Sequence, residues 1–418
     1  MLPSISSQPR CCKRFFNSIR PSLLAEHFAH FWRIVVLLAV LDGRRNLSAM
    51  TEATGRRRTR QAISHFLDQD TWDAASVLRK KAMDMLRELG WRQGHTVYAV
   101  IDDTQKRKRA KRMAAVQQLF LHAEKVYAPG HTIVACVLVY RGVVIPYALD
   151  LWAPEAYCLD AAQRGEPPLV FRKSTEIAAQ MIAGLKLPSQ GKVIVMFDSF
   201  YLCPAVIAAC KAREFAWISV AKKNRTFHPG GGHRDRRKLS SYGRNVLRRS
   251  GRTVSVGGKN YCLAERLGQL SRAGEVKLVF SRRGGERSWV VLATNQRPWS
   301  AKTIVSHYLK RWGIEVFFKM SKQHLGLGDY QVLRYRAVQQ HLRLVLIAYL
   351  LLTHLALQAP DVKAKLQDSQ SVLRLRSIPK LQQDLRTTLW EEAVHDLENR
   401  TTPRGFLRKI KRLFKRAA

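Results

Sequence analysis

Acidic residues are scarce in this 418-residue chain. Asp and Glu together number 31, against 72 Lys and Arg, so the formal net charge is +41. An enzyme that acts on small molecules needs no such excess of positive charge. We therefore expect a polyanionic partner, most simply nucleic acid, bound largely through release of counterions. A membrane surface is the competing polyanion.

Long hydrophobic runs are also missing. The longest, residues 34–41 and 344–352, fall well short of the roughly 20 apolar residues that span a bilayer. The first residues lack an apolar stretch followed by a small-residue cleavage site, so we expect no signal peptide. We accordingly predict no membrane partner. There is no internal repeat and no low-complexity segment.

Cysteine patterns typical of disulfides or zinc sites are absent. The seven cysteines are an odd number and include no C-x-x-C pair, and most lie in apolar segments. This favours buried thiols in a reduced, intracellular protein. A zinc site built from Cys11, Cys12, His27 and His30 is the alternative, but their spacing matches no usual ligand pattern.

Helical patterns dominate the first 92 residues. We predict helices over 22–41 and 72–89, with two shorter helices between them that meet at Thr54–Gly55. The second short helix opens on a basic cluster of Arg56, Arg57, Arg58 and Arg60. One interpretation is a helix-turn-helix-like domain whose arginines contact DNA, and the other is a plain helical bundle with a solvated basic face. We favour DNA contact, because four arginines in five positions repel one another without a counter-charge.

Buried strands and helices alternate between residues 93 and 223. We predict strands over 96–101 and 192–197, apolar on both faces, and a hairpin of 131–140 and 143–149 that turns at Arg141–Gly142. Helices follow at 174–187, with Ser174 as N-cap, and at 204–213; a last strand covers 215–220. We expect the basic segment 106–112 to be a loop. This order predicts a mixed sheet with helices on both faces.

Acidic residues follow the two central strands. Right-handed crossovers would bring the carboxyl ends of strands 97–101 and 192–197 side by side, so that Asp103 and Asp198 emerge at one edge. An Asp after a strand is often only a turn residue or a helix cap. Ligand sites in such sheets, however, gather at the carboxyl ends of strands.

A third acid lies beyond a segment of different composition. Residues 224–291 alternate like short antiparallel strands and form a β-rich insertion, with a glycine-rich basic loop at 228–238 that is either a phosphate cradle or plain solvated chain. Ser300 then caps a helix on which Tyr308, Arg311, Glu315 and Lys322 share an arc of roughly 60°. Salt bridges on an ordinary amphipathic helix would explain this stripe equally well.

The three acids together suggest metal chemistry. Two divalent ions about 3.5–4 Å apart require carboxylates that converge from separate elements. We predict that Asp103, Asp198 and Glu315 bind two Mg²⁺ ions, with Mn²⁺ as substitute, because these ions prefer oxygen ligands.

The spacing of these residues resembles a known family. Tyr308, Arg311, Glu315 and Lys322 match the Y-x2-R-x3-E-x6-K signature of insertion-sequence DDE transposases without a gap, and the resemblance extends over roughly residues 95–355. The runs 101–104 and 198–201 resemble the first and second acid motifs of the family. Alignment to its Asp-Thr pattern selects Asp103 over Asp102, which would face the other side of the sheet.

The resemblance implies a fold and an activity. The fold would be α/β, with a ribonuclease-H-like mixed sheet, helices on both faces, a β-rich insertion and helical N- and C-terminal regions. The activity would be metal-dependent cleavage at transposon ends followed by strand transfer into target DNA. Tyr308, Arg311 and Lys322 would bind DNA near the cleaved phosphate. Trp289, or alternatively Trp299, would stack on a flipped base.

The resemblance also implies an organisation. A DNA-binding domain (1–92) with a basic arm would precede the catalytic domain (93–223 and 292–355), which the insertion (224–291) interrupts. A helical C-terminal region (356–418) would help to form a homodimer that synapses two transposon ends in the prokaryotic cytoplasm, at the nucleoid. The basic amphipathic tail 404–416 could meet a membrane, DNA or a partner. The alternatives are a ribonuclease-H-like structure-selective nuclease and a non-catalytic DNA-binding protein derived from a transposase.

Overall fold

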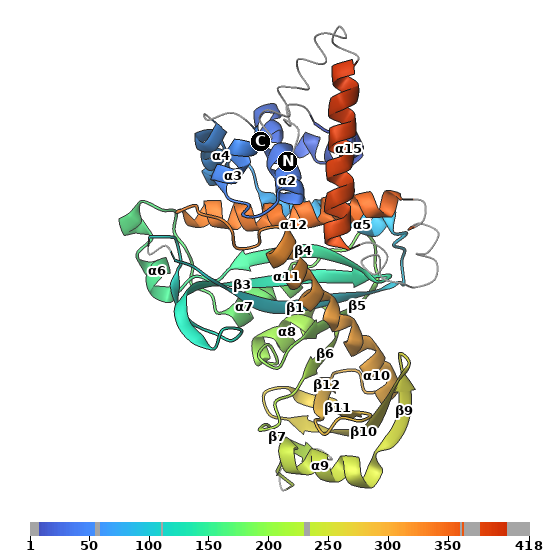
Figure 1. Ribbon diagram of the computed structural model, residues 1–418. Helices are drawn as coiled ribbons and strands as arrows, with labels where there is room; N and C mark the ends of the chain where they lie inside the picture. Colours follow the sequence, from blue (N-terminus) through green and yellow to red (C-terminus); the bar gives the residue numbers. More distant parts are fainter. Residues whose placement is uncertain are drawn as a thin grey trace.

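The protein is an α/β structure built on one large mixed sheet. The computed structural model describes residues 8–54, 59–109, 112–229, 235–359, 362 and 377–398. Its strands form a 12-stranded sheet with helices on both sides and helical regions toward both termini (Figure 1). This is the fold class expected from the sequence, and it is consistent with a ribonuclease-H-like fold.

The N-terminal region is a helical bundle. Its elements are η1 (Arg10–Cys12), α1 (Lys13–Asn17), η2 (Arg20–Ser22), α2 (Ala25–Val40), α3 (Leu47–Thr54), α4 (Thr59–Asp68) and α5 (Ala74–Glu88). α2 is apolar on most sides and lies at the centre of the bundle. Phe66 of α4 stacks on Trp72 with 4.4 Å between ring centroids. The helices predicted over 22–41 and 72–89 are confirmed as α2 and α5, while Arg56, Arg57 and Arg58 lie outside the described residues.

The central sheet positions the acids. Its strands are β1 (Thr96–Arg107), β2 (Gln117–Leu121), β3 (Val126–Tyr140), β4 (Val143–Leu151), β5 (Lys192–Phe197) and β6 (Ala216–Val220). β1 pairs with β3 antiparallel and with β5 parallel, and β5 pairs in parallel with β6. The predicted neighbourhood of strands 97–101 and 192–197 is therefore confirmed. So is the hairpin turn, since Arg141 and Gly142 both have the positive φ that such a turn requires.

Two local predictions are wrong. β1 does not end before Lys106 but runs to Arg107, because β3 begins as early as Val126 and pairs with it up to Gly130. The helix α7 (Ser174–Ala183) is capped by Lys173 rather than by Ser174, and it ends earlier than expected. The cap moves back by one residue because the Glu176 carboxylate accepts a hydrogen bond from the Lys173 backbone N–H at 2.8 Å.

Further helices cover the sheet. The remaining elements of this part are α6 (Glu155–Leu159), η3 (Ala162–Arg164) and α8 (Pro204–Ala212), and α8 packs against α7. α7 in turn contacts β3. The other face of the sheet is covered by α5 and by α12 (Tyr335–Gln358), which both contact β4. Parallel strands need both faces covered in this way.

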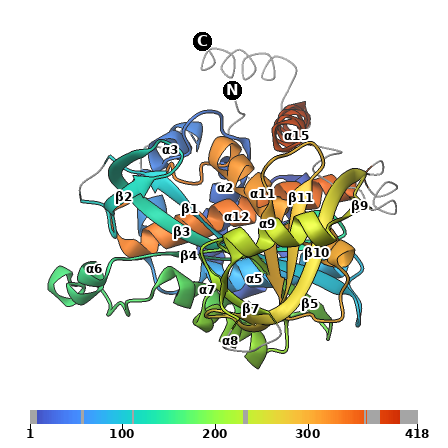
Figure 2. The ribbon, with the colours of Figure 1, turned by 90° about the horizontal axis from the view of Figure 1, so that it is seen from below.

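The segment expected to be a β-rich insertion extends the same sheet. It contains β7 (Thr226–Pro229), β8 (Arg237–Lys238), α9 (Leu239–Ser250), β9 (Arg252–Val256), β10 (Lys259–Leu270), β11 (Gly274–Arg283) and β12 (Val290–Thr294). β12 pairs antiparallel with β6 over three residue pairs. The Asn295 side chain accepts from the Trp217 N–H at 2.9 Å and donates to the Phe215 carbonyl at 3.1 Å. Figure 2 shows α9 lying across β10 and β11, which it contacts.

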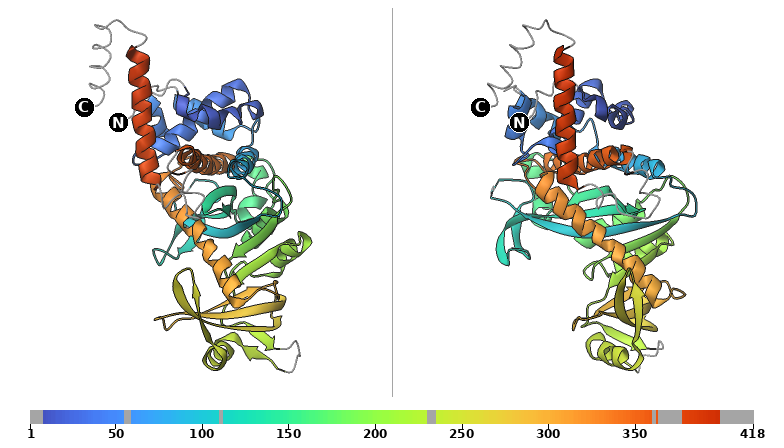
Figure 3. Two further views of the ribbon diagram at one scale, coloured as in Figure 1. Left: turned by 90° about the vertical axis from the view of Figure 1, so that its right-hand side faces the viewer. Right: turned by 45° about the vertical axis from the view of Figure 1, so that its right-hand side comes forward.

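Two linked helices run from this lower lobe across the sheet. They are α10 (Ala301–Tyr308) and α11 (Trp312–His324), joined by the 3-10 turn η4 (Leu309–Arg311). The lower lobe is the segment from β7 to β12, and both views of Figure 3 show the two helices descending to its strands β9–β12. Ser300 caps α10 as predicted, since its side chain accepts from the Thr303 N–H at 3.1 Å. A Cβ on Gly313 would lie 3.1–3.2 Å from the methyl groups of Val139 and Val144, so glycine lets α11 approach the sheet closely.

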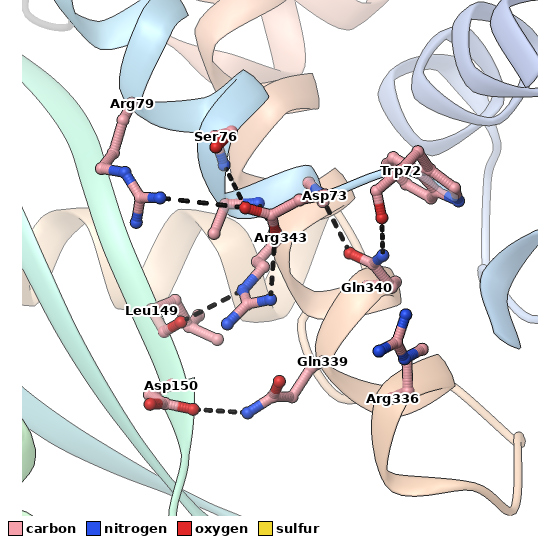
Figure 4. A network of polar contacts seen from close by, with 12 residues as sticks. Trp72, Asp73, Ser76, Arg79, Leu149, Asp150, Arg336, Gln339, Gln340 and Arg343 are labelled. Carbon is pink, nitrogen blue, oxygen red and sulfur yellow. Dashed lines mark hydrogen bonds and ion pairs between the residues drawn. The ribbon is translucent and has the colours of Figure 1, made fainter. Parts of the chain in front are cut away.

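The helix α12 joins the N-terminal bundle to the sheet (Figure 4). The Gln340 side chain donates to the Trp72 carbonyl at 3.1 Å and accepts from the Ala74 N–H at 3.2 Å. Arg343 donates to the Leu149 carbonyl of β4 and lies 3.8 Å from the Asp73 carboxylate. α12 is long and apolar enough to cross a membrane, but 89% of its apolar window is buried inside the protein, as in a core helix. The last described helix, α15 (Ile378–Glu398), packs against α2, α11 and α12.

Candidate active site

The two acids of β1 make separate contacts. Asp102 and Asp103 are neighbours in a stretch of β1 that pairs with β3 without a bulge, so their side chains leave opposite faces of the sheet. Asp102 accepts a hydrogen bond from Arg311 of η4 at 2.7 Å. Asp103 accepts one from the Tyr201 hydroxyl, beyond β5, at 3.0 Å. The expected divergence of the two side chains is therefore observed, and Asp102 is the one on the side of the Glu315 helix.

The guanidinium of Arg311 bridges two carboxylates. Its Nη1 contacts Asp102, and its Nη2 lies 2.5 Å from Oε1 of Glu315, one helical turn further along. The Arg311 and Asp102 side chains are only 16% and 20% exposed, so water screens this pair weakly. A planar guanidinium suits such a double contact, because its N–H groups form a rigid fork. Glu315 is thus linked to Asp102 of β1 through the Arg311 guanidinium.

Asp198 is close enough to Asp102 and Asp103 for its charge to act on both. β5 ends at Phe197, which pairs with Ile101, so the register brings Asp198 alongside Asp102. The Asp198 carboxylate accepts hydrogen bonds from the Phe200 and Tyr201 N–H groups at 2.9 and 3.3 Å, in the manner of a turn-capping Asp. Its negative charge also raises the pKa of both Asp102 and Asp103.

Burial makes these carboxyls hard to ionise. It raises the pKa of Asp102 to about 6, although the positive charge of Arg311 opposes the rise. Burial also raises the pKa of Asp103, and the hydrogen bond from Tyr201 opposes it. An added cation would stabilise the charged forms of Asp102 and Asp103. Perturbed carboxyl groups at a strand edge are typical of functional sites.

The remaining signature residues also face β1. The ring centroid of Tyr308 is 5.9 Å from the Arg311 guanidinium. Burial raises the pKa of the Tyr308 phenol to about 12. Lys322 donates to the Gln105 carbonyl at 3.0 Å, two residues beyond Asp103. Burial lowers the pKa of Lys322, while the Asp103 charge raises it. The predicted stripe on the 308–322 segment therefore turns toward the acids.

The donor set meets part of what a divalent ion requires. Within the described ranges, no three Asp, Glu, His or Cys side chains lie close enough together to hold one ion. Asp198 is near both β1 acids, whereas Glu315 is linked to Asp102 only through Arg311. The donors are nevertheless of the kind that Mg²⁺ prefers, since they are hard carboxylate oxygens, and the Arg311 guanidinium places a positive charge between Asp102 and Glu315.

The two tryptophans expected at a flipped base lie at opposite ends of the parallel strands: Trp289 comes just before β12, beside the carboxyl end of β6, and Trp299 lies at the other end. Trp289 is half-buried in the lower lobe, with its ring 6.2 Å from that of Phe280 and 4.2 Å from Nζ of Lys223. Trp299 packs on His307 at 4.9 Å and lines a cavity of about 1150 Å³ with Thr96 and Lys192, the first residues of their strands. That cavity is at the opposite end of β1 and β5 from the acids.

The edge of the sheet that carries Asp102, Asp103 and Asp198 is called the acid edge here. One predicted site residue, Arg60, lies away from it, and one residue at it, Tyr201, was not predicted. Arg60 is exposed on α4 in the N-terminal bundle. Tyr201 was not predicted as a site residue, although it holds Asp103; its position three residues after Asp198, in the second acid motif, was the available signal. Alignment to the Asp-Thr pattern of the family selected Asp103 over Asp102. Alternation along a strand predicts that the two side chains diverge, but not which of them faces the third acid.

Comparison with known families supports an enzymatic function. The family model of the DDE superfamily endonucleases matches residues 29–273, more than half of the chain. The match includes both β1 acids and Asp198 but stops before Glu315, so the Y-R-E-K segment is not part of it. A comparison with curated proteins gave no match. Enzymes of this superfamily act on DNA and generally use divalent metal ions. The chain belongs to the DDE superfamily endonucleases.

Proposed function

We propose that the protein is a DDE transposase that cleaves DNA at transposon ends and joins those ends to target DNA. The observation that carries the proposal is the Arg311 fork, which links the third acid of the signature, Glu315, to Asp102 beside Asp198. Asp102 and Glu315, which are more than two hundred positions apart in the sequence, are thus linked at one edge of the sheet. The net charge of +41 suits a DNA substrate.

Each residue has a proposed role. Asp198 and Glu315, with either Asp103 or Asp102 as first acid, would hold Mg²⁺, or Mn²⁺ in its place. The bound ions would activate a water molecule or a 3′-hydroxyl and stabilise the departing oxygen of a phosphodiester. Before the ions bind, Arg311 would neutralise the charge of Asp102 and Glu315. After they bind, its guanidinium would contact the DNA phosphate instead. Lys322 and Tyr308 flank that phosphate as charge and hydrogen-bond donors.

The surrounding regions have proposed roles of their own. Residues 1–92, with Arg56, Arg57, Arg58 and Arg60, would bind DNA, and residues 93–223 and 292–355 would form the catalytic domain. The segment 224–291 would contact the transposon end, with Trp289 as the base-stacking residue. Residues 356–418 would support a homodimer. The exposed position of Arg60 supports its role, whereas Trp289 would have to leave its contact with Lys223.

The first experiment uses the DNA on either side of the gene. Terminal inverted repeats found there supply the substrate, and end cleavage and strand transfer are measured with the purified chain and Mg²⁺. Replacing Asp198 by Asn or Glu315 by Gln should reduce cleavage by about 10³-fold or more while DNA binding persists. Comparing Asp102→Asn with Asp103→Asn identifies the first acid. Glu214→Gln, which alters an exposed carboxylate at the opposite end of the parallel strands, is the matched control.

The outcomes separate the alternatives. Cleavage without strand transfer indicates a structure-selective nuclease of the same fold. Binding without any cleavage, by a chain whose acids are intact, indicates a non-catalytic DNA-binding protein. A fully active Glu315→Gln variant would refute the assignment of the third acid.

A further inference from the structure

A hairpin beside the acids exposes two aromatic side chains. β2 and β3 meet in a turn at residues 122–125, and Phe120 pairs directly with Tyr127 across the two strands. Their ring centroids are 5.2 Å apart. Tyr127 is 78% exposed and Phe120 is 38% exposed. An aromatic pair left open to water in this way marks an interaction site more often than a lone apolar residue does.

Contacts tie this hairpin to the candidate active site. The Gln105 side chain accepts a hydrogen bond from the His122 N–H at 3.3 Å, and the Gln105 carbonyl accepts one from Lys322 at 3.0 Å. Gln105 is two residues beyond Asp103 on β1, so both side chains lie on one face of the strand. His122 is also close enough for its charge to act on Asp103, and its ring is 5.3 Å from that of Phe120.

The charges around the aromatic pair are mainly positive. Lys125 occupies the turn with a positive φ of 54° and is exposed, and His122 lies beside it. The Glu124 carboxylate is 3.0 Å from Arg107, which offsets its negative charge. Aromatic faces interleaved with cations are the combination by which proteins bind unpaired nucleic acid, with bases stacked on rings and phosphates on cations.

We propose that Phe120 and Tyr127 form a stacking platform for an unpaired base of the DNA strand that enters the acid edge. The proposal rests on the proposed function, and it names the part of the substrate that this edge recognises: a nucleobase freed from its duplex near the cleaved phosphate. Tyr127 supplies the open ring, and Phe120 packs against it and fixes its orientation. Lys322 donates to the Gln105 carbonyl and is close enough for the Asp103 charge to act on it, so a cation is present beside both residues.

The test measures binding without cleavage. The full chain, in EDTA, is titrated with a single-stranded 15-mer that carries one 2-aminopurine and with the fully paired duplex of the same sequence. Affinity is read from fluorescence anisotropy, and stacking from quenching of 2-aminopurine. Tyr127→Ala should weaken single-strand binding about tenfold or more and abolish the quenching. Tyr127→Phe should retain both, since stacking needs the ring and not the hydroxyl.

Matched variants distinguish base stacking from charge attraction and from a general change in the hairpin. Val126→Ala changes an exposed neighbour on the same hairpin and should leave affinity and quenching unchanged, whereas Lys125→Ala should weaken both DNA forms and leave quenching intact. Equal losses on single-stranded and paired DNA for Tyr127→Ala, or none, would overturn the proposal. So would a change in sedimentation alone, which would assign the platform to contact with a second copy of the chain.

The inference and the proposed function fail separately. If Tyr127→Ala loses the base contact in a chain that neither cleaves nor joins DNA, the platform stands and the transposase assignment falls. If end cleavage and strand transfer are intact in both proteins and quenching is unchanged in Tyr127→Ala, the transposase assignment stands and the platform falls.

Discussion

Arg311 occupies the place of a cation, so removing its charge should make room for one. In Arg311→Gln the fork between Asp102 and Glu315 is lost. An ion entering the native site must displace at least one of two charge-assisted hydrogen bonds, each worth about 1.5–3 kcal/mol. At the lower value, release from one bond corresponds to a gain of about tenfold in affinity for Mn²⁺. We expect that gain at pH 8.

The gain should disappear as the pH falls. Arg311 lowers the pKa of Asp102, which is already about 6 because of burial. Without the guanidinium this pKa rises further, so protons replace the arginine as competitors of the ion. Near pH 6 the variant should therefore bind Mn²⁺ no better than the native protein. The sign follows from the group: a carboxyl with a raised pKa is neutral over a wider acidic range.

The assay is a titration followed by the EPR signal of free Mn²⁺, at pH 6 and pH 8. Arg107→Gln is the matched control, because Arg107 forms an exposed salt bridge on the same strand and should not affect binding. Arg311→Lys keeps the charge without the fork and should fall between native protein and Arg311→Gln. Weaker Mn²⁺ binding by Arg311→Gln at pH 8 would refute the view that the guanidinium stands in for an ion.

Three further predictions concern stability and DNA. The pKa of Asp102 is about 6 in the fold and roughly 3.9 when unfolded, so its ionisation costs stability as the pH rises through that window. Asp102→Asn should therefore raise the free energy of unfolding by about 3 kcal/mol at pH 8 and leave it almost unchanged below pH 4, measured by urea denaturation. Burial lowers the pKa of Lys108 to about 7, so below that pH the fold must hold a buried charge; relative to Lys108→Met, the native protein should gain about 2 kcal/mol between pH 7 and pH 9, and a flat difference would contradict this. Binding of duplex DNA should fall by roughly 10³-fold or more between 50 and 200 mM salt, and a small response would argue against binding led by phosphate contacts.

The sequence predicts the elements of the core better than their ends. Apolar runs on both faces identify β5 and the first half of β1, because a buried parallel strand needs such runs. The second half of β1 is polar and basic, and only its pairing with β3 makes it a strand. That pairing depends on contacts distant in sequence, which local patterns do not contain. The helix α9 was missed, although Leu239, Gly243, Val246 and Leu247 recur at helical spacing on its buried face.

In the candidate site, too, local spacing predicts some features and contacts distant in sequence decide the rest. The spacing of Tyr308, Arg311, Glu315 and Lys322 predicts a shared stripe, and the contacts of these residues with β1 and with one another agree with it. Their partners could not be predicted in the same way. Whether Arg311 contacts Asp102 or Asp103 depends on which face of β1 the helix covers. Gly313 packs against Val139, whose partner Tyr98 lies on the same face of β1 as Asp102.

The seam between β6 and β12 has a mechanical consequence. Three residue pairs, the hydrogen bond from the Ala221 N–H to the Val291 carbonyl and the two hydrogen bonds of the Asn295 side chain join β12 to β6 and the chain on either side of it. A swing that separated the two strands would break backbone hydrogen bonds, whereas torsion about the strand axis would keep them. The short pairing of β6 with β12 therefore allows the lower lobe to twist more easily than to separate from the sheet. A load on α9 would rotate β10 and β11 relative to β1, and α10 would carry that rotation toward Arg311.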